Sequence, residues 1–253
     1  MPWAAKRRLI ILIIVGAVFA AALSTILIAT LYQAPSCTDR TQNQGEAGID
    51  CGGPCAYLCS AELQPPTILF TKAIHNGTGR TSVIASIENK NVAAAAKDVP
   101  YRVRLYGAGR TLIQETTGLF DLPPGGVVPI FIPGIVSEKQ VVVGAFLDIT
   151  ASPQWYPMTT DPRIVPRVSS TKQGGTVDAP RIEAVLVNPS TTMIANVLTI
   201  VLVRDEKGDI IAASRTIVPA ISSGRQATAT FTWNSAFPGT PASIEIIPVI
   251  PLP

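Results

Sequence analysis

The sequence predicts an all-β protein, in which a single N-terminal transmembrane helix and a short disulfide-rich segment precede two tandem Ig-like antiparallel β-sandwich domains. Three observations lead to this prediction. An uncharged segment lies near the N-terminus, four cysteines cluster after it, and the remaining chain consists of short apolar stretches broken by glycine and proline. With 47% hydrophobic and 15% charged residues, the chain is also too apolar for a disordered protein.

The predicted membrane anchor is the uncharged segment 9–31, preceded by Lys6, Arg7 and Arg8. As a helix this segment would be about 35 Å long, enough to cross a hydrocarbon layer of about 30 Å. Basic residues mark the cytoplasmic end of a membrane helix. We therefore expect residues 1–32 to form a cytoplasmic end and a signal anchor in the cell membrane, with all later domains extracytoplasmic.

Two alternatives to a retained anchor are open at this point. A signal peptidase could cleave after the small residues 20–22, although the apolar segment continues to Leu31. Lipid attachment at Cys37 is less compatible with the sequence, because Pro35 stands where a lipobox has a small or β-branched residue. The length of the apolar segment favours the retained anchor.

Charge restricts the partners of the exported part. The net charge is +3, but beyond the basic cluster the chain has 17 basic and 17 acidic residues. Without a basic run it has no surface that follows a phosphate backbone, so we expect no nucleic-acid partner. The expected partners are the lipid bilayer, through residues 9–31, and an envelope protein that the sequence does not identify.

Four cysteines, Cys37, Cys51, Cys55 and Cys59, lie in segment 33–62, which we predict to be a cysteine-rich stalk. Their even number, their dense spacing and an oxidising location favour two disulfides, for which three pairings exist. A four-thiolate zinc site is the competing structure, but the paired C-x2-C spacings of such sites are absent.

The stalk combines its cysteines with acidic residues and glycines. Residues 37–55 read C-x-D-x3-N-x-G-E-x-G-x-D-C-G-G-x-C, which resembles a short module of bacterial cell-surface proteins. The resemblance implies an extracellular, disulfide-held spacer and no activity. Asp39, Asn43, Glu46 and Asp50 also supply four oxygen donors, which are compatible with one calcium ion or, alternatively, with Asx-type hydrogen bonds that cap turns. No other cofactor is expected.

From about Ile68 onward we predict an internal repeat of the sequence. A gap-free alignment at an offset of 99 residues pairs Asn89 with Asn188, Gly109 with Gly208, Gly125 with Gly224, and the strand 99–103 with 198–202. A period of this length is typical of tandem sandwiches. We predict a first sandwich at 66–152, a proline-rich linker at 153–167 and a second sandwich at 162–253, with few contacts between the two domains.

Alternation along the strands predicts which faces are buried. Val103 and Leu105 alternate with Arg102 and Arg104, which indicates one buried and one solvated face. In the second repeat Phe231 alternates with Thr230 and Thr232 in the same way, so we expect Phe231 to be buried. Segment 197–203, by contrast, is apolar on both faces apart from Thr199. It is either a central strand partly covered by a loop or a contact with the first domain or a partner.

The strand–turn–strand block of each repeat also carries a resemblance. Residues 103–106 (VRLY) precede a glycine turn, and residues 201–205 (VLVRD) precede Gly208. These blocks are similar to the FxLYD-like family of small extracytoplasmic sandwiches, although valine replaces the family's phenylalanine in both and Gly107 replaces its aspartate in the first. The resemblance implies a scaffold or binding role without a shared catalytic set.

Catalytic patterns are missing from the sequence. His75 is the single histidine, and it ends a predicted strand before a turn at Asn76-Gly77. The adjacent Asp205 and Glu206 would point to opposite faces of a strand. We expect no enzyme, and predict a membrane-anchored structural or protein-interaction protein of the bacterial cell envelope. The alternatives are a surface binding module, such as an adhesin or glycan reader, and, least favoured, an extracytoplasmic enzyme.

Overall fold

The computed structural model describes residues 3–31, 36–43, 45–75, 80–137 and 140–253. The chain forms two compact units, Met1–Cys55 and Ala56–Pro253. Strands account for 49% of the chain and helices for 14%, which confirms the predicted all-β class with one N-terminal apolar helix. The turn predicted at Asn76-Gly77 lies outside the described residues.

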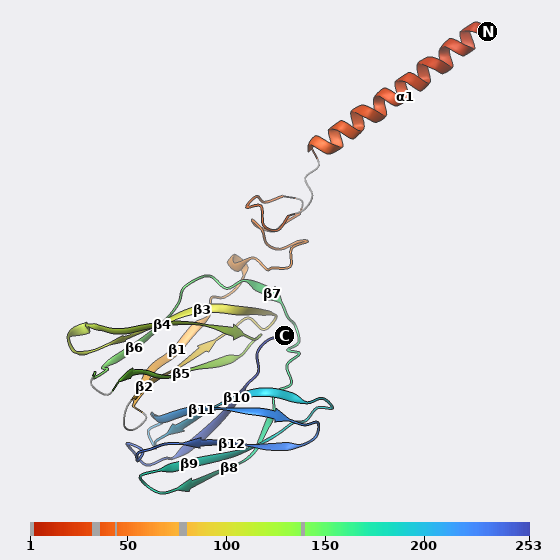
Figure 1. Cartoon of the computed structure of the whole chain (residues 1–253). Coiled ribbons are helices and arrows are strands. Elements are labelled where there is room, and N and C mark those ends of the chain that lie inside the picture. Colours follow the sequence, from red (N-terminus) through yellow and green to blue (C-terminus); the bar gives the residue numbers. More distant parts are fainter. Residues whose placement is uncertain (1–2, 32–35, 44, 76–79, 138–139) are drawn as a thin grey trace. The chain divides into compact units, whose positions relative to one another are not determined.

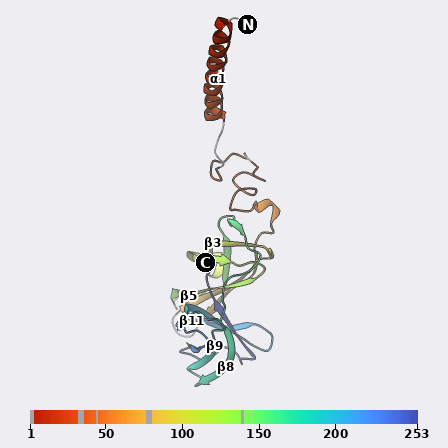
Figure 2. The same ribbon diagram turned by 90° about the vertical axis from the view of Figure 1, so that its right-hand side faces the viewer.

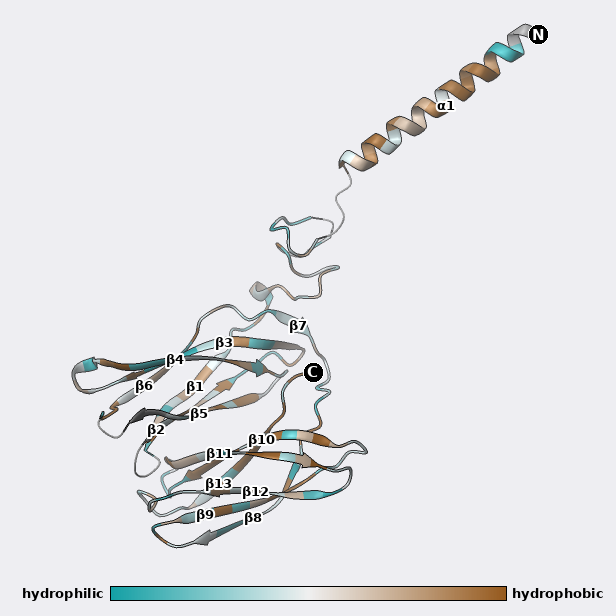
Figure 3. Cartoon of the chain, in the orientation of Figure 1, coloured by the Kyte–Doolittle hydropathy of each residue, from teal (hydrophilic) through white to brown (hydrophobic). Residues whose placement is uncertain are grey.

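The first unit contains helix α1 (Trp3–Leu31) and a segment of turns that holds the first three cysteines (Figure 1). Within α1, Lys6–Leu31 is long and apolar enough to cross a membrane. Figure 3 shows hydrophobic residues along this helix beyond its basic first turns. A soluble amphipathic helix would keep a polar face. The helix therefore has the length and composition expected of the predicted anchor.

The second unit begins with the 3-10 turn η1 (Ser60–Glu62) and the first sandwich. One sheet has the order β1-β2-β5 and the other β4-β3-β6, and all pairs are antiparallel. The strands are β1 (Thr67–His75), β2 (Arg80–Glu88), β3 (Ala94–Tyr106), β4 (Leu112–Leu122), β5 (Val127–Ser137) and β6 (Gly144–Ile149). The short strand β7 (Trp155–Pro157) pairs with β3 within the predicted linker, and Trp155 fills the first core.

The second sandwich has the same arrangement of strands. Its sheets have the orders β12-β9-β8 and β11-β10-β13. Its core includes Ile182, Val201 and Phe231, so the predicted alternation that buries Phe231 is confirmed. The strands are β8 (Arg167–Gly175), β9 (Pro180–Val187), β10 (Ile194–Arg204), β11 (Ile210–Ile221), β12 (Gln226–Thr232) and β13 (Ser243–Val249).

A third hydrophobic cluster joins the two sandwiches. It lies between the outer face of β1-β2-β5 and the outer face of β11-β10-β13, so the four sheets stack in layers (Figures 1 and 2). Its buried members are Ile74, Ile84, Phe131, Ile200, Leu202, Ile210 and Ala213. The expectation of few contacts between the domains is wrong. Segment 197–203 is apolar on both faces because one face fills the second core and the other contacts the first sandwich.

Two buried asparagines close corresponding corners of the sandwiches. The Asn89 side-chain amide donates to the carbonyls of Ala94 and Pro123 at 2.8 and 2.7 Å. The Asn188 amide donates to those of Thr192 and Ile221 at 2.7 and 2.9 Å. Both asparagines are 1% exposed. Each amide satisfies backbone acceptors that would otherwise be buried without a partner.

The gap-free pairing of the strands 99–103 and 198–202 is wrong by one residue. Val99 and Val103 fill the first core, and Val197 and Val201, each 98 residues later, fill the second. Leu202, which the gap-free alignment pairs with Val103, lies in the cluster between the sandwiches. A slip of one residue moves a side chain to the other face of a strand. The slip arises directly after the buried asparagines. The Asn89 amide bonds the carbonyl of a residue five positions later, whereas the Asn188 amide bonds one only four positions later, so the second sandwich is one residue shorter here.

The C-terminal residues return to the first sandwich. The Leu252 amide donates to the Asp121 carboxylate at 2.8 Å, and Leu252 is buried. Arg163, which pairs with Asp161, donates to the Ile250 carbonyl at 2.9 Å. These contacts add a polar connection between the sandwiches to the apolar one.

Candidate functional site

A groove lies on the solvent-facing side of the sheet β4-β3-β6, with a volume of about 690 Å³. Alternation along β3 directs Val103 and Leu105 into the core and therefore directs Arg104 and Tyr106 to the outer face. Strand β6, which pairs with β3, contributes Phe146 and Asp148 to the same groove. The lining residues are Arg104, Tyr106, Gly107, Gly109, Arg110, Val143, Gly144, Phe146 and Asp148.

Two aromatic rings form the apolar part of the groove. The rings of Tyr106 and Phe146 meet edge to face, with centroids 5.7 Å apart and an interplanar angle of 76°. Phe146 is 58% exposed and Val143 is 65% exposed. Large apolar side chains left in solvent at one place on a surface are typical of binding sites.

Paired charges lie beside the rings. The Arg104 guanidinium donates to the Asp148 carboxylate, and this hydrogen bond raises the pKa of Arg104 above its ordinary value. Next to it, Arg102 lies 3.9 Å from Glu115. The Nε atoms of both arginines are buried and have no hydrogen-bond partner in the part of the chain that the structure describes.

Arg110 brings a further cation to the groove from the turn between β3 and β4. Among the described residues, no carboxylate lies within ion-pair distance of it. Its φ of 62° is left-handed, a conformation that residues other than glycine, asparagine and aspartate seldom adopt. The turns superimpose at an offset of 98 residues, because the hydrogen bond from the Gly107 amide to the Thr111 carbonyl corresponds to that from Asp205 to Asp209. Arg110 therefore corresponds to Gly208, with a φ of 83°, and the predicted pairing of Gly208 with Gly109, whose own φ is 69°, is wrong by one residue.

The predicted site residues do not contribute to this groove, and the sequence prediction missed it. One signal was present in residues 144–149, GAFLDI. Leu147 alternates with Phe146 and Asp148, so burying the leucine exposes an aromatic ring and a carboxylate on one face. The arginines of β3 were recognised as solvent-facing, but the sequence does not show that β6 lies beside them.

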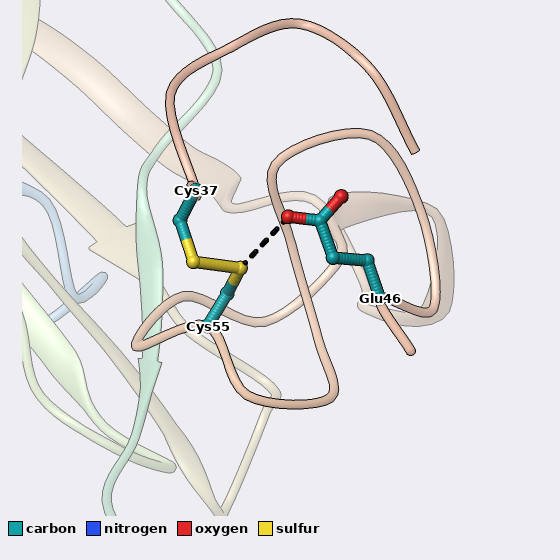
Figure 4. Close-up of side chains that lie close together, drawn as sticks. All are labelled: Cys37, Glu46 and Cys55. Carbon is teal, nitrogen blue, oxygen red and sulfur yellow. Dashed lines mark hydrogen bonds between the residues drawn. A yellow bond between two sulfur atoms is a disulfide. The ribbon is translucent and has the colours of Figure 1, made fainter. Parts of the chain in front are cut away.

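The cysteine segment contains two disulfides, which pair Cys37 with Cys55 and Cys51 with Cys59. The prediction of two disulfides is confirmed, and the four-thiolate zinc alternative is wrong because the sulfurs are bonded to one another. Figure 4 shows the first bond beside Glu46, whose Oε1 lies 3.1 Å from the Cys55 sulfur. These three side chains converge, but sulfurs in a disulfide offer no thiolate to a metal.

The four candidate calcium ligands make hydrogen bonds within turns. The Asp39 carboxylate accepts from a backbone amide two residues later at 2.9 Å, and the Asp50 carboxylate accepts from an amide ten residues earlier at 3.0 Å. Glu46 Oε2 accepts from the amides of Asn43 and Asp50 at 3.4 and 3.3 Å, and Asn43 Nδ2 donates to Asp39. These contacts are those of the turn-capping alternative. Calcium binding stays a prediction.

The remaining predicted residues lie at the ends of elements. Lys6, Arg7 and Arg8 occupy the first turns of α1, where the Arg7 guanidinium lies 4.9 Å from the centre of the Trp3 ring. His75 ends β1, and its Nδ1 lies 3.0 Å from the Thr81 hydroxyl. This is the strand-end position predicted for the histidine.

No family model matches the sequence, and no curated protein matches it. Among solved structures, the chain is similar to red sea bream transglutaminase, with 8% identity and a TM-score of 0.23 over 69% of this chain and 27% of that one. It is also similar to a β-glucuronidase from glycoside hydrolase family 2, with 12% identity and a TM-score of 0.23 over 81% of this chain and 25% of that one. This chain therefore spans only a minor part of either protein. Likeness at these TM-scores says nothing about function.

Proposed function

We propose that this chain is a membrane-anchored, extracytoplasmic structural or protein-interaction protein of the bacterial cell envelope. The observation that carries the proposal is the order of its parts: a membrane-length helix, then two disulfides, then a double sandwich. Disulfides persist in oxidising compartments and are rare in the cytosol. The resemblance of residues 37–55 to a bacterial surface module supports an envelope location.

The proposed topology places the N-terminus in the cytoplasm and the sandwiches outside. Lys6, Arg7 and Arg8 precede the span, while the described residues 36–43 and 45–59 after it include one basic residue, Arg40. Basic residues on one side of a span retain that side in the cytoplasm. This asymmetry supports a single-pass anchor through residues 9–31.

The double sandwich supports a scaffold or interaction role. Because the apolar cluster fixes one sandwich on the other, the body presents its outer faces in a constant geometry. Such a body suits a protein that presents a binding surface to a partner. A second candidate, a surface binding module, is favoured by one observation, the exposed Phe146 ring that meets the half-buried Tyr106 ring in the groove. We do not propose an enzymatic activity.

Membrane fractionation and thiol labelling test this proposal. The chain is expected to stay with membranes after carbonate washing, and external protease should digest the sandwiches in cells whose outer layers are permeabilised. Mass spectrometry without reduction should find all four cysteines unalkylated. As a control, substituting Lys6, Arg7 and Arg8 by Glu should reduce the exported fraction. A soluble mature form that starts near Leu23, or four alkylated cysteines, would contradict the proposal.

A further inference from the structure

The groove occupies a face that already serves as an interface in the other half of the molecule. In the second sandwich, Ile200 and Leu202 on the outer face of β10 contact the first sandwich. In the first sandwich, the positions 98 residues earlier are Arg102 and Arg104, on the outer face of β3. The same face of the same sheet therefore docks a protein surface in one sandwich and is free in the other.

The composition of this free face is that of a protein-binding surface. Aromatic residues and arginine are enriched at protein interfaces. Here Tyr106, Phe146 and Arg104 meet in one groove, and the exposed Val141 and Val143 lie next to it in sequence. The groove's volume of about 690 Å³ is large enough for a few side chains of a bound segment.

The charges of the groove favour an acidic partner. Asp148 neutralises Arg104, whereas Arg110 lacks a carboxylate partner among the described residues, so the groove carries one uncompensated positive charge. Arg110 also holds a left-handed conformation, which is unfavourable for a residue with a side chain and which Gly208 adopts without this cost in the other sandwich. Keeping an arginine at such a position is consistent with a use for its guanidinium.

We propose that the groove binds a protein segment in which an aliphatic or aromatic side chain lies next to a carboxylate. The apolar side chain packs on Phe146 and Val143, and the carboxylate accepts hydrogen bonds from Arg110. A protein ligand is favoured over a saccharide because the equivalent face of the second sandwich contacts a protein surface and because the exposed Val143 lines the groove beside the rings. The inference rests on the proposed interaction function and specifies its site.

The test uses the full chain in lipid nanodiscs and a phage library of random decapeptides. Selected peptides are expected to share an apolar residue next to Asp or Glu. Fluorescence polarisation with the synthesised peptides then compares Arg110→Gly and Phe146→Ser with the parent chain. Each substitution should weaken binding about tenfold or more, because each removes one half of the recognition.

Two controls separate loss of the site from loss of the fold. Arg110→Gly introduces the residue that suits the left-handed position, so its melting temperature should equal or exceed that of the parent chain. Arg225→Ala removes one exposed positive charge from the second sandwich and should leave binding unchanged. The proposal is overturned if selected peptides lack carboxylates, if both groove variants bind like the parent, or if an array of acidic glycans binds where peptides do not. Any of these results leaves the membrane test of the proposed function unaffected.

Discussion

Ile200→Ala tests whether the cluster between the sandwiches joins them into one folding unit. Ile200 is 1% exposed and lies in this cluster rather than in the second core. Truncating a buried isoleucine to alanine costs about 2–5 kcal/mol. For a body of this size, about 3 kcal/mol lowers the melting temperature by roughly 6–12 °C. We expect a loss in this range for both sandwiches together.

The tryptophans allow each sandwich to be followed separately. Trp155 is buried in the first core and Trp233 in the second, while the third tryptophan, Trp3, lies in α1. In a Trp3→Phe background, single-tryptophan chains report thermal unfolding of either sandwich by fluorescence. Coupled sandwiches should give the same midpoint with either probe, before and after the Ile200 substitution.

Ile217→Ala is the matched control for this experiment. Ile217 lies opposite Leu198 in the same sheet but is 60% exposed, so its truncation should change stability by less than about 0.5 kcal/mol. If Ile200→Ala behaves like this control, the cluster contributes little to stability. If the parent chain shows two separate midpoints, the sandwiches fold independently and the reasoning from the cluster fails.

Three further predictions follow from other contacts. Arg102→Ile combined with Arg104→Leu copies the apolar face of the second sandwich and should produce concentration-dependent association in sedimentation velocity; a monomer at all concentrations would contradict it. Asn89→Ala leaves buried carbonyls unpaired and should lower the free energy of unfolding by roughly 2–4 kcal/mol in denaturant titration. A loss below about 0.5 kcal/mol would instead show that water replaces the amide. The hydrogen bond from Arg163 lowers the pKa of Asp161 below its ordinary 3.8, so the pair stabilises the fold above that pH and this stabilisation is lost as the pH falls through the lowered pKa. Asp161→Asn should therefore reduce the melting temperature slightly at pH 7, and the difference from the parent chain should shrink as the solution is acidified through the lowered pKa; a difference that does not change with pH would contradict this.

The sequence was sufficient to predict those features of the structure that depend only on residues close together in the chain. The span of α1, the burial of Val103 and Phe231 and the solvated side of Arg104 follow from composition and alternation within one segment. An oxidising location predicted two disulfides, but four cysteines permit three pairings, and only the three-dimensional path of the chain selects between them.

Contacts between segments that are distant in the sequence could not be predicted from local patterns. Both faces of segment 197–203 are apolar, which indicated a cover but did not identify Ile84 and Phe131 as its source. The groove likewise depends on Arg104 and Phe146 lying opposite each other on adjacent strands. A gap-free alignment that is anchored on asparagines and glycines at turns also cannot reveal a one-residue deletion between these anchors. Such a deletion shifts the strand by one position and moves each of its side chains to the opposite face.

The two sandwiches differ at the outer faces of their equivalent sheets, which are apolar in one sandwich and polar in the other. Ile84 on the docking face of the first corresponds to Glu183 at an offset of 99 residues, and Leu202 on the docking face of the second corresponds to Arg104 at an offset of 98. We propose that the sandwiches arose by duplication and then diverged at these faces. If both outer faces of each sandwich were apolar, each chain could bind a second chain with one face and a third with the other. Repeated contacts of this heterologous kind produce fibres when they do not close into a ring. On this proposal the polar residues at these positions limit the stack to two sandwiches, and on the side of Arg104 the solvated face contains the groove.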